Sequence, residues 1–413
     1  MKPGDVDLAD PQNPVRYEGA PVEYFEALRR HDPVHWNELT DAGRMERPSM
    51  QRGFWVLTKY DDVVRASKDH AYFSSHVGGP VLWDLENVEG ALNNQRAGMM
   101  GMDPPDSSRY RKLIAPPFTP RNVDKLEPII AAKAKAIVDG IASKGRCDFV
   151  MDLSWDLPIQ MMCEFMGVPH EDRELIFDLS TAAATPEGKT AEEHQGAVGG
   201  LAMYALQLAG KKREDPDDGL VSRYANGEVE GAELNDLEIA QFFTTLSIAS
   251  HETTRNTSNH FMRLLTEHPD QKALLLRDLD ALLPNAIEEV LRHSPPVMQF
   301  RRTMAQDLEL RGKKLRKGDK VYMSYVSANR DEDKFEDPAR FDITRANAKE
   351  HLAFGSGNHF CLGARLARMQ LRVLFTEILT RLPDIHVVEP PERLTTIWFD
   401  GIQKMEVEYT PER

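Results

Sequence analysis

One short segment of this chain has residue types and spacing suited to binding a metal. It surrounds Cys361 and reads Phe354-Gly355-Ser356-Gly357-Asn358-His359-Phe360-Cys361-Leu362-Gly363, directly before a stretch of helical periodicity. Cys361 therefore lies at the start of a helix, where unpaired backbone N–H groups favour a thiolate. Gly357 permits a tight turn, and Gly363 permits close approach to a flat ligand or a neighbouring chain. These features suit an iron ligand, although a cysteine taken in isolation is more often an ordinary loop residue.

A second chemical feature lies in the longest segment of helical period, residues 238–267. One face of this segment is mostly apolar and carries Phe242, Leu246, Ala249, Thr253 and Thr257 at spacings of three or four. Glu252 is next to Thr253 in the sequence, so it points to another side of the helix. A threonine on such a face usually donates its hydroxyl hydrogen to a carbonyl of its own helix. The face alone therefore assigns no function.

Together the two segments resemble a known family. The cysteine segment has the full FxxGxHxCxG pattern and resembles the haem-binding loop of the cytochrome P450 family, and the run Ala249-Ser250-His251-Glu252-Thr253-Thr254 resembles the family's acid and alcohol pair. The resemblance implies that Cys361 is the iron ligand of haem b, that Thr253 holds dioxygen and that Glu252 helps to relay protons. Ser250 stands where the family usually has glycine, so the geometry of the oxygen groove is left open. His251 matches no ligand position and receives no role.

The resemblance implies further contacts with the cofactor. Arg111, Arg302 and His359 match positions that bind the haem propionates, which need cationic or hydrogen-bonding partners when partly buried. Many relatives have histidine where this chain has Ser107, which predicts a weaker or water-mediated propionate contact. The remaining residues expected around the haem are Phe354, Gly355, Gly363 and Ala249.

A structural ion network is also expected from the resemblance. Glu289 and Arg292 are three residues apart on a predicted helix and can pair across one turn. Exposed pairs of this kind contribute little to stability. In the family, however, an ExxR motif and a distal arginine form a buried network around the cysteine loop, and we expect Arg340 to be that arginine.

The candidate substrate pocket is mostly apolar, which predicts an apolar substrate. Each of its residues, taken singly, is about equally well explained as core. The predicted lining is Val81, Leu82, Trp83, Met99, Met100, Phe242, Leu246, Val297, Met298, Ile397, Trp398 and Phe399.

The periodicity predicts a mainly α-helical fold with small β-sheets, and the resemblance places the haem between the long central helix and the helix after the cysteine loop. Helices are expected at 22–30, 123–143, 155–166, 238–267, 271–283, 286–293 and 363–382, and strands at 54–57, 308–310, 320–324 and 406–409. Asn235 and Glu238 can form a capping box at the start of the longest helix. We expect one domain over residues 1–413, with a flexible segment at about 1–20 and a mobile lid at 181–199. The resemblance covers about 21–409.

Composition excludes several classes of protein. The net charge is −15, so no overall field draws the chain to nucleic acid or to anionic lipid. No apolar run approaches the length of a membrane span, and the first residues lack the pattern of a secretory signal. Cys147, Cys163 and Cys361 are far apart and suggest no disulfide framework. Cys163 lies in an apolar run and is expected to be buried core. We expect a cytoplasmic protein.

The function implied by the resemblance is a haem-dependent monooxygenase. It would insert one atom of O2 into a sterol, terpenoid, fatty-acyl or similar apolar molecule, with electrons passing from NAD(P)H through ferredoxin reductase and ferredoxin. Basic residues that can form a docking patch for ferredoxin are Arg109, Lys112, Arg365, Arg368 and Arg372. Three alternatives stay open at this point: a peroxide-driven peroxygenase, a non-catalytic haem sensor or electron carrier, and a helical scaffold without haem.

Overall fold

The computed structural model describes residues 6–10, 20–41, 52–82, 90–184, 191–394 and 396–412. The chain forms two compact units, each assembled from separate segments. Unit 1 comprises Met1–Ser108, Glu288–Cys361 and Arg393–Gly401, and unit 2 comprises Arg109–Ile287, Leu362–Glu392 and Ile402–Arg413. Within the described residues, no helix is both long and apolar enough to span a bilayer. The expectation of a single domain stays a prediction.

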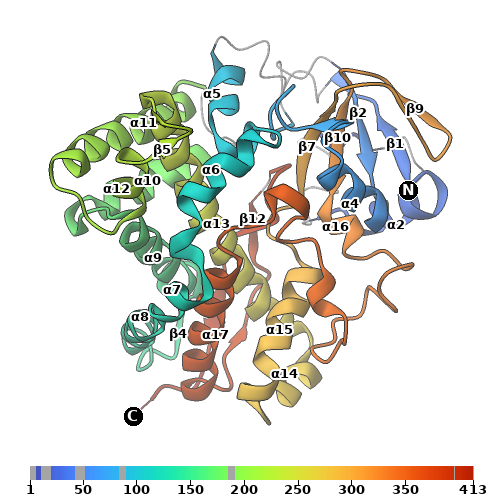
Figure 1. The fold of residues 1–413 in the computed structure, drawn as a ribbon. Helices are drawn as coiled ribbons and strands as arrows, with labels where there is room; N and C mark the ends of the chain where they lie inside the picture. The colour runs from blue at the N-terminus through green and yellow to red at the C-terminus, as the bar shows by residue number, and fades with distance from the viewer. Residues whose placement is uncertain are drawn as a thin grey trace. The chain divides into compact units, whose positions relative to one another are not determined.

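Unit 1 is built on a five-stranded sheet with strand order β1-β2-β10-β7-β3 (Figure 1). Its strands are β1 (Val34–Asn37), β2 (Phe54–Leu57), β3 (Phe73–Ser74), β7 (Gln299–Met304) and β10 (Lys320–Ser324). β2 and β10 pair in parallel, and the other neighbours are antiparallel. Strands far apart in the sequence therefore form one scaffold for the segments around the cysteine loop.

Both faces of this sheet are buried. Along β10, Tyr322 belongs to one hydrophobic cluster, whereas Val321 and Met323 belong to another, as the alternation of side chains in a strand requires. One cluster includes α2 (Val22–His31), and the other includes α4 (Tyr60–Lys68). Burial on both faces explains the continuous apolar runs of the parallel pair, which are Phe54–Leu57 in β2 and 321–323 in β10.

The remaining elements of unit 1 are short. They are α5 (Ala91–Ala97), the 3-10 helix η2 (Met99–Gly101), the hairpin of β8 (Leu308–Leu310) and β9 (Lys313–Leu315), α16 (Tyr325–Ala328), and the 3-10 helices η6 (Ala348–Glu350) and η7 (Gly357–His359). α6 (Asp106–Ile114) and α15 (Leu279–His293) each contribute residues to both units.

Unit 2 is mainly helical, and its longest helix is α13 (Asp236–Glu267). This helix contacts α9 (Asp156–Met166), α10 (Arg173–Ala184) and α11 (Ala191–Glu214) (Figure 1). With 32 residues, α13 is about 48 Å long at 1.5 Å per residue. Asn235 Oδ1 accepts from Glu238 N, and the Glu238 carboxylate accepts from Asn235 N, so the predicted capping box is confirmed. The two residues that predicted the start of α13 therefore satisfy backbone N–H groups at its N-terminus.

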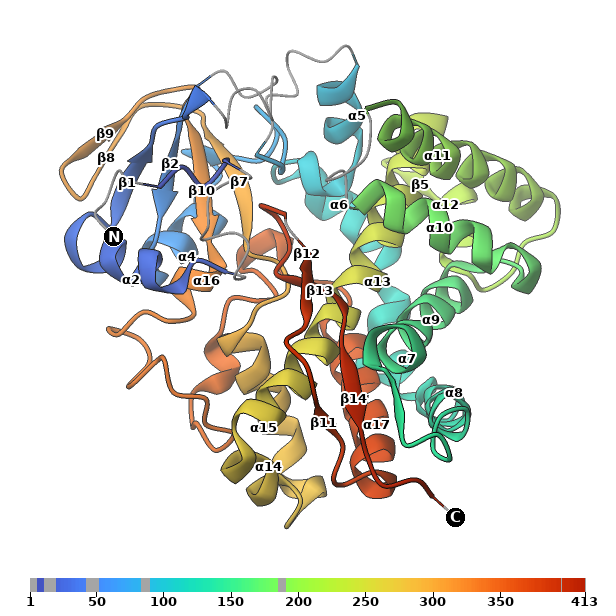
Figure 2. The same cartoon turned by 180° about the vertical axis from the view of Figure 1, so that it is seen from behind.

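The other helices of unit 2 are η3 (Pro116–Phe118), α7 (Pro120–Asp124), α8 (Glu127–Asp139), the π-helix η4 (Val150–Ser154), α9 (Asp156–Met166), η5 (His170–Asp172), α10 (Arg173–Ala184), α11 (Ala191–Glu214), α12 (Leu220–Ala225), α14 (Pro269–Leu275) and α17 (Ala364–Arg381). Its strands include β4 (Arg146–Asp148), β5 (Glu228–Val229), β6 (Ala232–Glu233), β11 (His386–Val387) and β14 (Glu406–Glu408). β14 lies between β11 and β4, and Figure 2 shows β11 and β14 side by side. β12 (Glu392–Leu394) and β13 (Gly401–Lys404) lie where the chain passes between the units.

Several predicted boundaries were wrong. The helix expected at 123–143 is two helices, because Pro128 lacks an N–H and so favours a new first turn in α8. The predicted break near Pro284 is instead at residues 276–278, where the Asp278 carboxylate caps α15 by accepting from Ala281 N (3.1 Å). α15 continues through Pro284.

In two segments expected to be mobile, the described residues are mostly helical or buried. In the predicted lid, residues 181–184 end α10 and residues 191–199 begin α11, while 185–190 lie outside the described residues. In the segment expected to be flexible, residues 6–10 are largely buried, with Val6, Leu8 and Ala9 in the core of unit 1.

Candidate active site

The cysteine loop is closed by one backbone hydrogen bond. Cys361 N donates to Phe354 O at 2.8 Å, and η7 lies between these two residues. Gly357 has a φ of +70°, and a Cβ there would lie 2.8 Å from the Ser67 carbonyl oxygen. Glycine is therefore required at this position by both conformation and space.

The three cysteines occupy different environments. Burial raises the pKa of the Cys147 and Cys163 thiols to about 12, and both side chains lie in the core. The prediction that Cys163 is a buried core residue is confirmed. Cys361 is only partly buried. It is thus the cysteine most accessible to a ligand.

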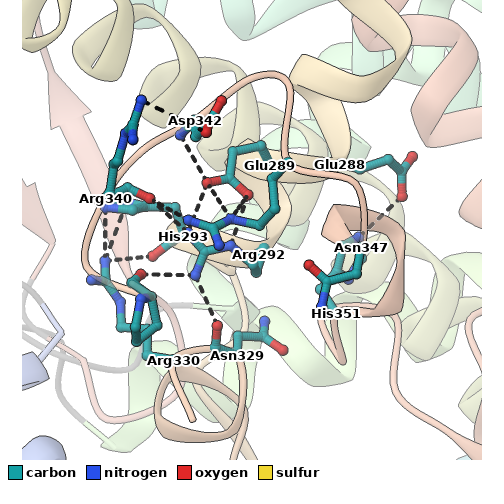
Figure 3. Close-up of polar contacts among 12 residues, drawn as sticks. Glu288, Glu289, Arg292, His293, Asn329, Arg330, Arg340, Asp342, Asn347 and His351 are labelled. Carbon is teal, nitrogen blue, oxygen red and sulfur yellow. Dashed lines mark hydrogen bonds and ion pairs between the residues drawn. The ribbon is translucent and has the colours of Figure 1, made fainter. Parts of the chain in front are cut away.

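Phe354, the first residue of the cysteine loop, packs against two neighbouring rings. The Phe354 ring lies 5.5 Å from the His351 ring and 6.4 Å from the Phe360 ring. His351 Nδ1 accepts from Ala353 N (3.1 Å), so the Nε2–H is the group that faces Glu288 Oε2 at 3.2 Å (Figure 3). Glu288 therefore fixes both the position and the tautomer of the imidazole against Phe354.

Asn358 joins the cysteine loop to the start of α6. Its amide nitrogen donates to Ser107 Oγ, and its amide oxygen accepts from Ser108 Oγ at 2.7 Å. Ser107 is buried. The hydroxyl that replaces the family's histidine is thus engaged within the protein, where it positions the loop.

Arg302 has the surroundings expected of a residue that binds a carboxylate ligand. Its side chain is buried and donates to the Arg301 carbonyl oxygen (2.9 Å), and no carboxylate of the described residues forms an ion pair with it. Burial lowers the pKa of this guanidinium, while Tyr325 and Asp103 partly oppose that effect. A buried cation without an anionic partner is costly, so this site fits an anionic group of a ligand. His359, the other predicted propionate ligand of unit 1, has its Nε2 3.4 Å from Ser75 Oγ.

Gly363 is the N-cap residue of α17, with an ordinary φ of −83°. A Cβ added there would meet no described atom within 4 Å. Neither conformation nor packing within the protein requires glycine at this position, whereas close approach of a flat ligand would. Arg111, also predicted to contact the cofactor, lies half-buried on α6 in unit 2.

The predicted pair of Glu289 and Arg292 is present in unit 1 (Figure 3), but the second arginine of the network is not the predicted one. Arg292 donates to both oxygens of Glu289 at 2.7 and 2.8 Å, and both side chains are fully buried. The second guanidinium on Glu289 is that of Arg345, with Nε 3.1 and 3.2 Å from the two oxygens. The assignment of Arg340 to this role was wrong, because its side chain is 62% exposed and pairs with Asp342 (3.9 Å) in place of Glu289, while its carbonyl oxygen accepts from Arg292 and Arg345.

The hydroxyls of α13 donate to their own helix. Thr253 Oγ1 donates to Ala249 O at 2.8 Å, and Ser250 Oγ donates to Leu246 O at 2.6 Å. Ser250 and Leu246 also line a cavity of about 30 Å³, large enough for one water molecule. The extra hydroxyl of Ser250 therefore lies at a place that can be hydrated.

Glu252 is completely buried beside Thr253 and forms an ion pair. Its Oε2 accepts from Arg255 at 2.6 Å and from Asn256 at 3.4 Å, whereas Oε1 has no hydrogen-bond partner among the described residues. The Arg255 guanidinium lies over the Trp155 ring, 4.9 Å from its centroid. Sequence reasoning missed Arg255, although the i, i+3 spacing to Glu252 was a usable signal.

His251 completes this buried group. Both ring nitrogens lack hydrogen-bond partners among the described residues, and the ring lies edge-on to Trp155 and Phe177 at 5.3 Å from each. Burial, and secondarily Arg255, hold the pKa of His251 well below its ordinary value. His251 is therefore neutral at neutral pH.

Part of the predicted substrate lining is brought together in unit 1. Val297 and Phe399 form a β-bridge, and Met298 N donates to Trp398 O at 2.8 Å. Leu82, Met298 and Ile397 share one core cluster, and Val81 is buried. Met99 and Met100 are half-buried in η2, and Trp83 lies outside the described residues.

The rest of that lining belongs to unit 2. Leu246 lines the small cavity described above, and Phe242 stacks on Tyr224 with centroids 3.8 Å apart. Phe242 is thus packed as a core residue.

The predicted basic docking patch is partly neutralised by acidic partners. Arg109 pairs with Glu230, Arg365 with Asp124 and Arg372 with Glu127, at 2.7 to 2.9 Å. All these side chains are substantially exposed, so the pairs contribute little energy and can be exchanged for contacts with a partner.

Comparison with known proteins agrees with this geometry. A family model described as Cytochrome P450 matches residues 187–384. A steroid C26-monooxygenase of Mycolicibacterium smegmatis is 35% identical over 413 residues, which is 99% of this chain and 94% of that protein. A methyl-branched lipid omega-hydroxylase of Mycobacterium tuberculosis is 37% identical over 395 residues, 94% of this chain and 90% of that protein.

The chain belongs to the cytochrome P450 family. Among solved structures, a Mycobacterium marinum cytochrome P450 in complex with pseudoionone has a TM-score of 0.88 and 36% identity, with 99% of each chain covered. The fold is therefore the cytochrome P450 fold, as predicted, and the protein is a cytochrome P450 monooxygenase. The family uses haem and O2 and takes its electrons from redox partners.

We predict that Arg345→Met lowers the free energy of unfolding by about 3 kcal/mol, because it leaves the buried Glu289 carboxylate with one guanidinium. Arg340→Met is the matched control and should change it by less than about 0.5 kcal/mol, since that side chain is exposed. Urea unfolding of the two variants measures the difference. Equal effects would show that Arg345 is not the second arginine of the network.

We predict that His251 makes the protein less stable in acid. Its pKa is lowered in the folded state, so below a pH of about 6.5 the unfolded chain binds a proton that the native state does not. Stability should fall with decreasing pH by up to about 1.4 kcal/mol per pH unit from this group. His251→Phe should flatten that slope in urea unfolding between about pH 5 and 7. The control His386→Gln, at an exposed position, should retain it; a parallel loss of slope in both variants would contradict the prediction.

Proposed function

We propose that this monooxygenase binds haem b through the Cys361 thiolate and hydroxylates the end of an apolar, methyl-branched hydrocarbon chain. The observation that carries the proposal is the cysteine loop, in which the Cys361–Phe354 hydrogen bond, Gly357 and Asn358 hold a partly exposed thiol two residues before the N-cap of α17. The haem, when bound, supplies the activation of O2.

The residues of this chain fit that cofactor. We assign Arg302 and His359 to its carboxylates, because Arg302 is a buried cation without a carboxylate partner among the described residues, and we assign Gly363 to its flat face, because a Cβ there would meet no described atom. Phe354, braced by His351, can shield the thiolate from water. We assign to Thr253 the hydroxyl that holds dioxygen and to Glu252 the carboxylate that passes protons.

The substrate class rests on the relatives and on the predicted pocket. The names of the two relatives share one feature, because C26 is a terminal carbon of a steroid side chain and omega denotes the end of a lipid chain. Val81, Leu82, Val297, Met298 and Ile397 are all buried and apolar, which suits such a chain. Electrons would come from NAD(P)H through ferredoxin reductase and ferredoxin. A cytoplasmic location stays a prediction.

We predict that Cys361→His abolishes the red-shifted Soret band of the reduced carbon monoxide complex, because that band requires a thiolate ligand. Cys163→Ala, which removes a buried core thiol, should retain the band. Absorption spectra of the purified, haem-loaded variants decide the assignment, and persistence of the band in Cys361→His would refute it.

We predict that Thr253→Ala retains haem but diverts reducing equivalents to hydrogen peroxide, with a loss of coupling of about 10-fold or more. Product and peroxide formed per NAD(P)H consumed give the measurement, with Thr257→Ala, one turn along α13, as the control. Normal coupling in Thr253→Ala would refute the role of this hydroxyl. Turnover of wild-type protein with peroxide alone, at the rate seen with redox partners, would favour the peroxygenase alternative.

A further inference from the structure

Residues 6–10 are anchored in unit 1 by one buried carboxylate. Asp7 Oδ1 accepts from Ala9 N (2.8 Å) and Asn37 Nδ2 (2.9 Å), and Asp7 Oδ2 accepts from Thr40 N (2.8 Å) and Thr40 Oγ1 (3.1 Å). Leu8 N donates in turn to Asn37 Oδ1 at 2.9 Å. Asp7 is 3% exposed, and Asn37 is fully buried. The segment is thus hydrogen-bonded to the end of β1 and to the residues that follow it.

The apolar side chains of the same segment enter the core. Val6, Leu8 and Ala9 belong to the hydrophobic cluster that contains Leu82, Met298 and Ile397. Those last three side chains are in the predicted substrate lining. Residues 6–10 and the predicted pocket wall therefore pack in one continuous cluster.

The backbone of this wall is held independently of residues 6–10. Met298 N donates to Trp398 O, Val297 bridges to Phe399, and Asp400 N donates to Pro296 O at 3.0 Å. Arg393 pairs with Asp400 at 3.0 Å in the same region. The wall's backbone is therefore fixed, and its side chains are the part that responds to what packs against them.

We propose that residues 6–10 form a strap that determines substrate selectivity, by setting the space available to Leu82, Met298 and Ile397 in the pocket wall. The inference rests on the proposed function, because it takes these residues as substrate lining. Protein interiors are close-packed, so removing volume on the strap side lets the wall side chains move away from the substrate. A change in the side-chain volume of residues 6–10 should therefore change which shapes of substrate chain the pocket accepts.

The Asp7 anchor distinguishes a strap from a segment that only adds stability. Burial of more apolar surface would be enough for stability, whereas a buried carboxylate with donors on both oxygens fixes the segment in one position. Buried polar groups are costly when unsatisfied and therefore specify a unique arrangement. Fixed placement is what a selectivity determinant needs.

The test compares Leu8→Ala with Leu28→Ala. Both changes remove the same atoms from the same cluster, and neither residue is in the predicted lining, but Leu8 lies in the proposed strap whereas Leu28 lies on α2. The haem-loaded variants are titrated spectrally with pseudoionone, a methyl-branched long-chain fatty acid and a sterol with an intact side chain, and the hydroxylated carbon is identified for each.

We expect Leu8→Ala to change the ratio of dissociation constants between the largest and smallest ligand by about fivefold or more, and to shift the hydroxylated position. Leu28→Ala should leave that ratio within about twofold while lowering the melting temperature to a similar extent. Asp7→Asn, which keeps the shape and loses the charge, should change the ratio in the same direction and decides the matter if Leu8→Ala does not fold.

The proposed role of the strap would be refuted if Leu8→Ala and Asp7→Asn were less stable but kept the wild-type ratio of dissociation constants and the wild-type hydroxylated carbon. Failure of the proposed function is recognised separately. In that case the wild-type protein itself would lack the thiolate Soret band or would show no spectral response to any of the three ligands.

Discussion

The structure of the chain before the cysteine loop depends on the ion pairs that Arg292 and Arg345 form with one buried carboxylate, that of Glu289. It accepts from Arg292, from Arg345 and from Asp342 N, so all of its hydrogen-bonding capacity is used inside the protein. The two guanidinium groups continue outward to the carbonyl oxygens of Asn329, Glu336, Asp337, Pro338 and Arg340. Asn329 Oδ1 in turn accepts from Leu352 N at 2.6 Å, shortly before the cysteine loop. The segment 329–352 has little regular secondary structure, so these side-chain hydrogen bonds hold it in place. Such a network adds little net stability, but it permits very few alternative arrangements.

The contrast between two buried arginines shows where a ligand is needed. Arg292 donates to both oxygens of Glu289, so its charge is compensated within the protein. Arg302 lies in the same unit, is similarly buried, and has a carbonyl oxygen in place of a carboxylate. Burial lowers the pKa of the Arg302 guanidinium, and no ion pair with a carboxylate of the described residues offsets that effect. The sequence separated these two residues only through the family resemblance, which assigned Arg292 to the ion network and Arg302 to a haem propionate. In the structure their partners differ in the way those two assignments require.

Features carried by short stretches of sequence were predictable, and features that depend on distant partners were not. The capping box of α13 and the turn at Gly357 follow from residues within a few positions of one another. Arg340 and Arg345 lie in the same aperiodic segment, so nothing local indicated which side chain would turn inward. The burial of residues 6–10 depends on Asn37 and Thr40, about thirty positions away. The Asp278 cap and the Glu252–Arg255 pair were local, and their spacing carried a signal that the sequence analysis did not use.

The hydrogen bond from Thr253 to Ala249 is compatible with a role in handling dioxygen. A hydroxyl has one hydrogen to donate, so Thr253 cannot donate to a ligand while it donates to its own helix. Rotation of the side chain exchanges this bond for another, at a cost on the order of 1 kcal/mol because the carbonyl keeps its helical partner. Glu252 is more strongly held, since its Oε2 is paired with Arg255 in a buried setting. Its other oxygen has no hydrogen-bond partner among the described residues and lies 3.5 Å from His251 Nδ1. A proton can therefore be added at Oε1 while the hydrogen bonds from Arg255 and Asn256 to Oε2 are kept, although the charge of the pair is then lost. In the proposed mechanism the alcohol is thus the mobile member of the pair, and the acid is the fixed one.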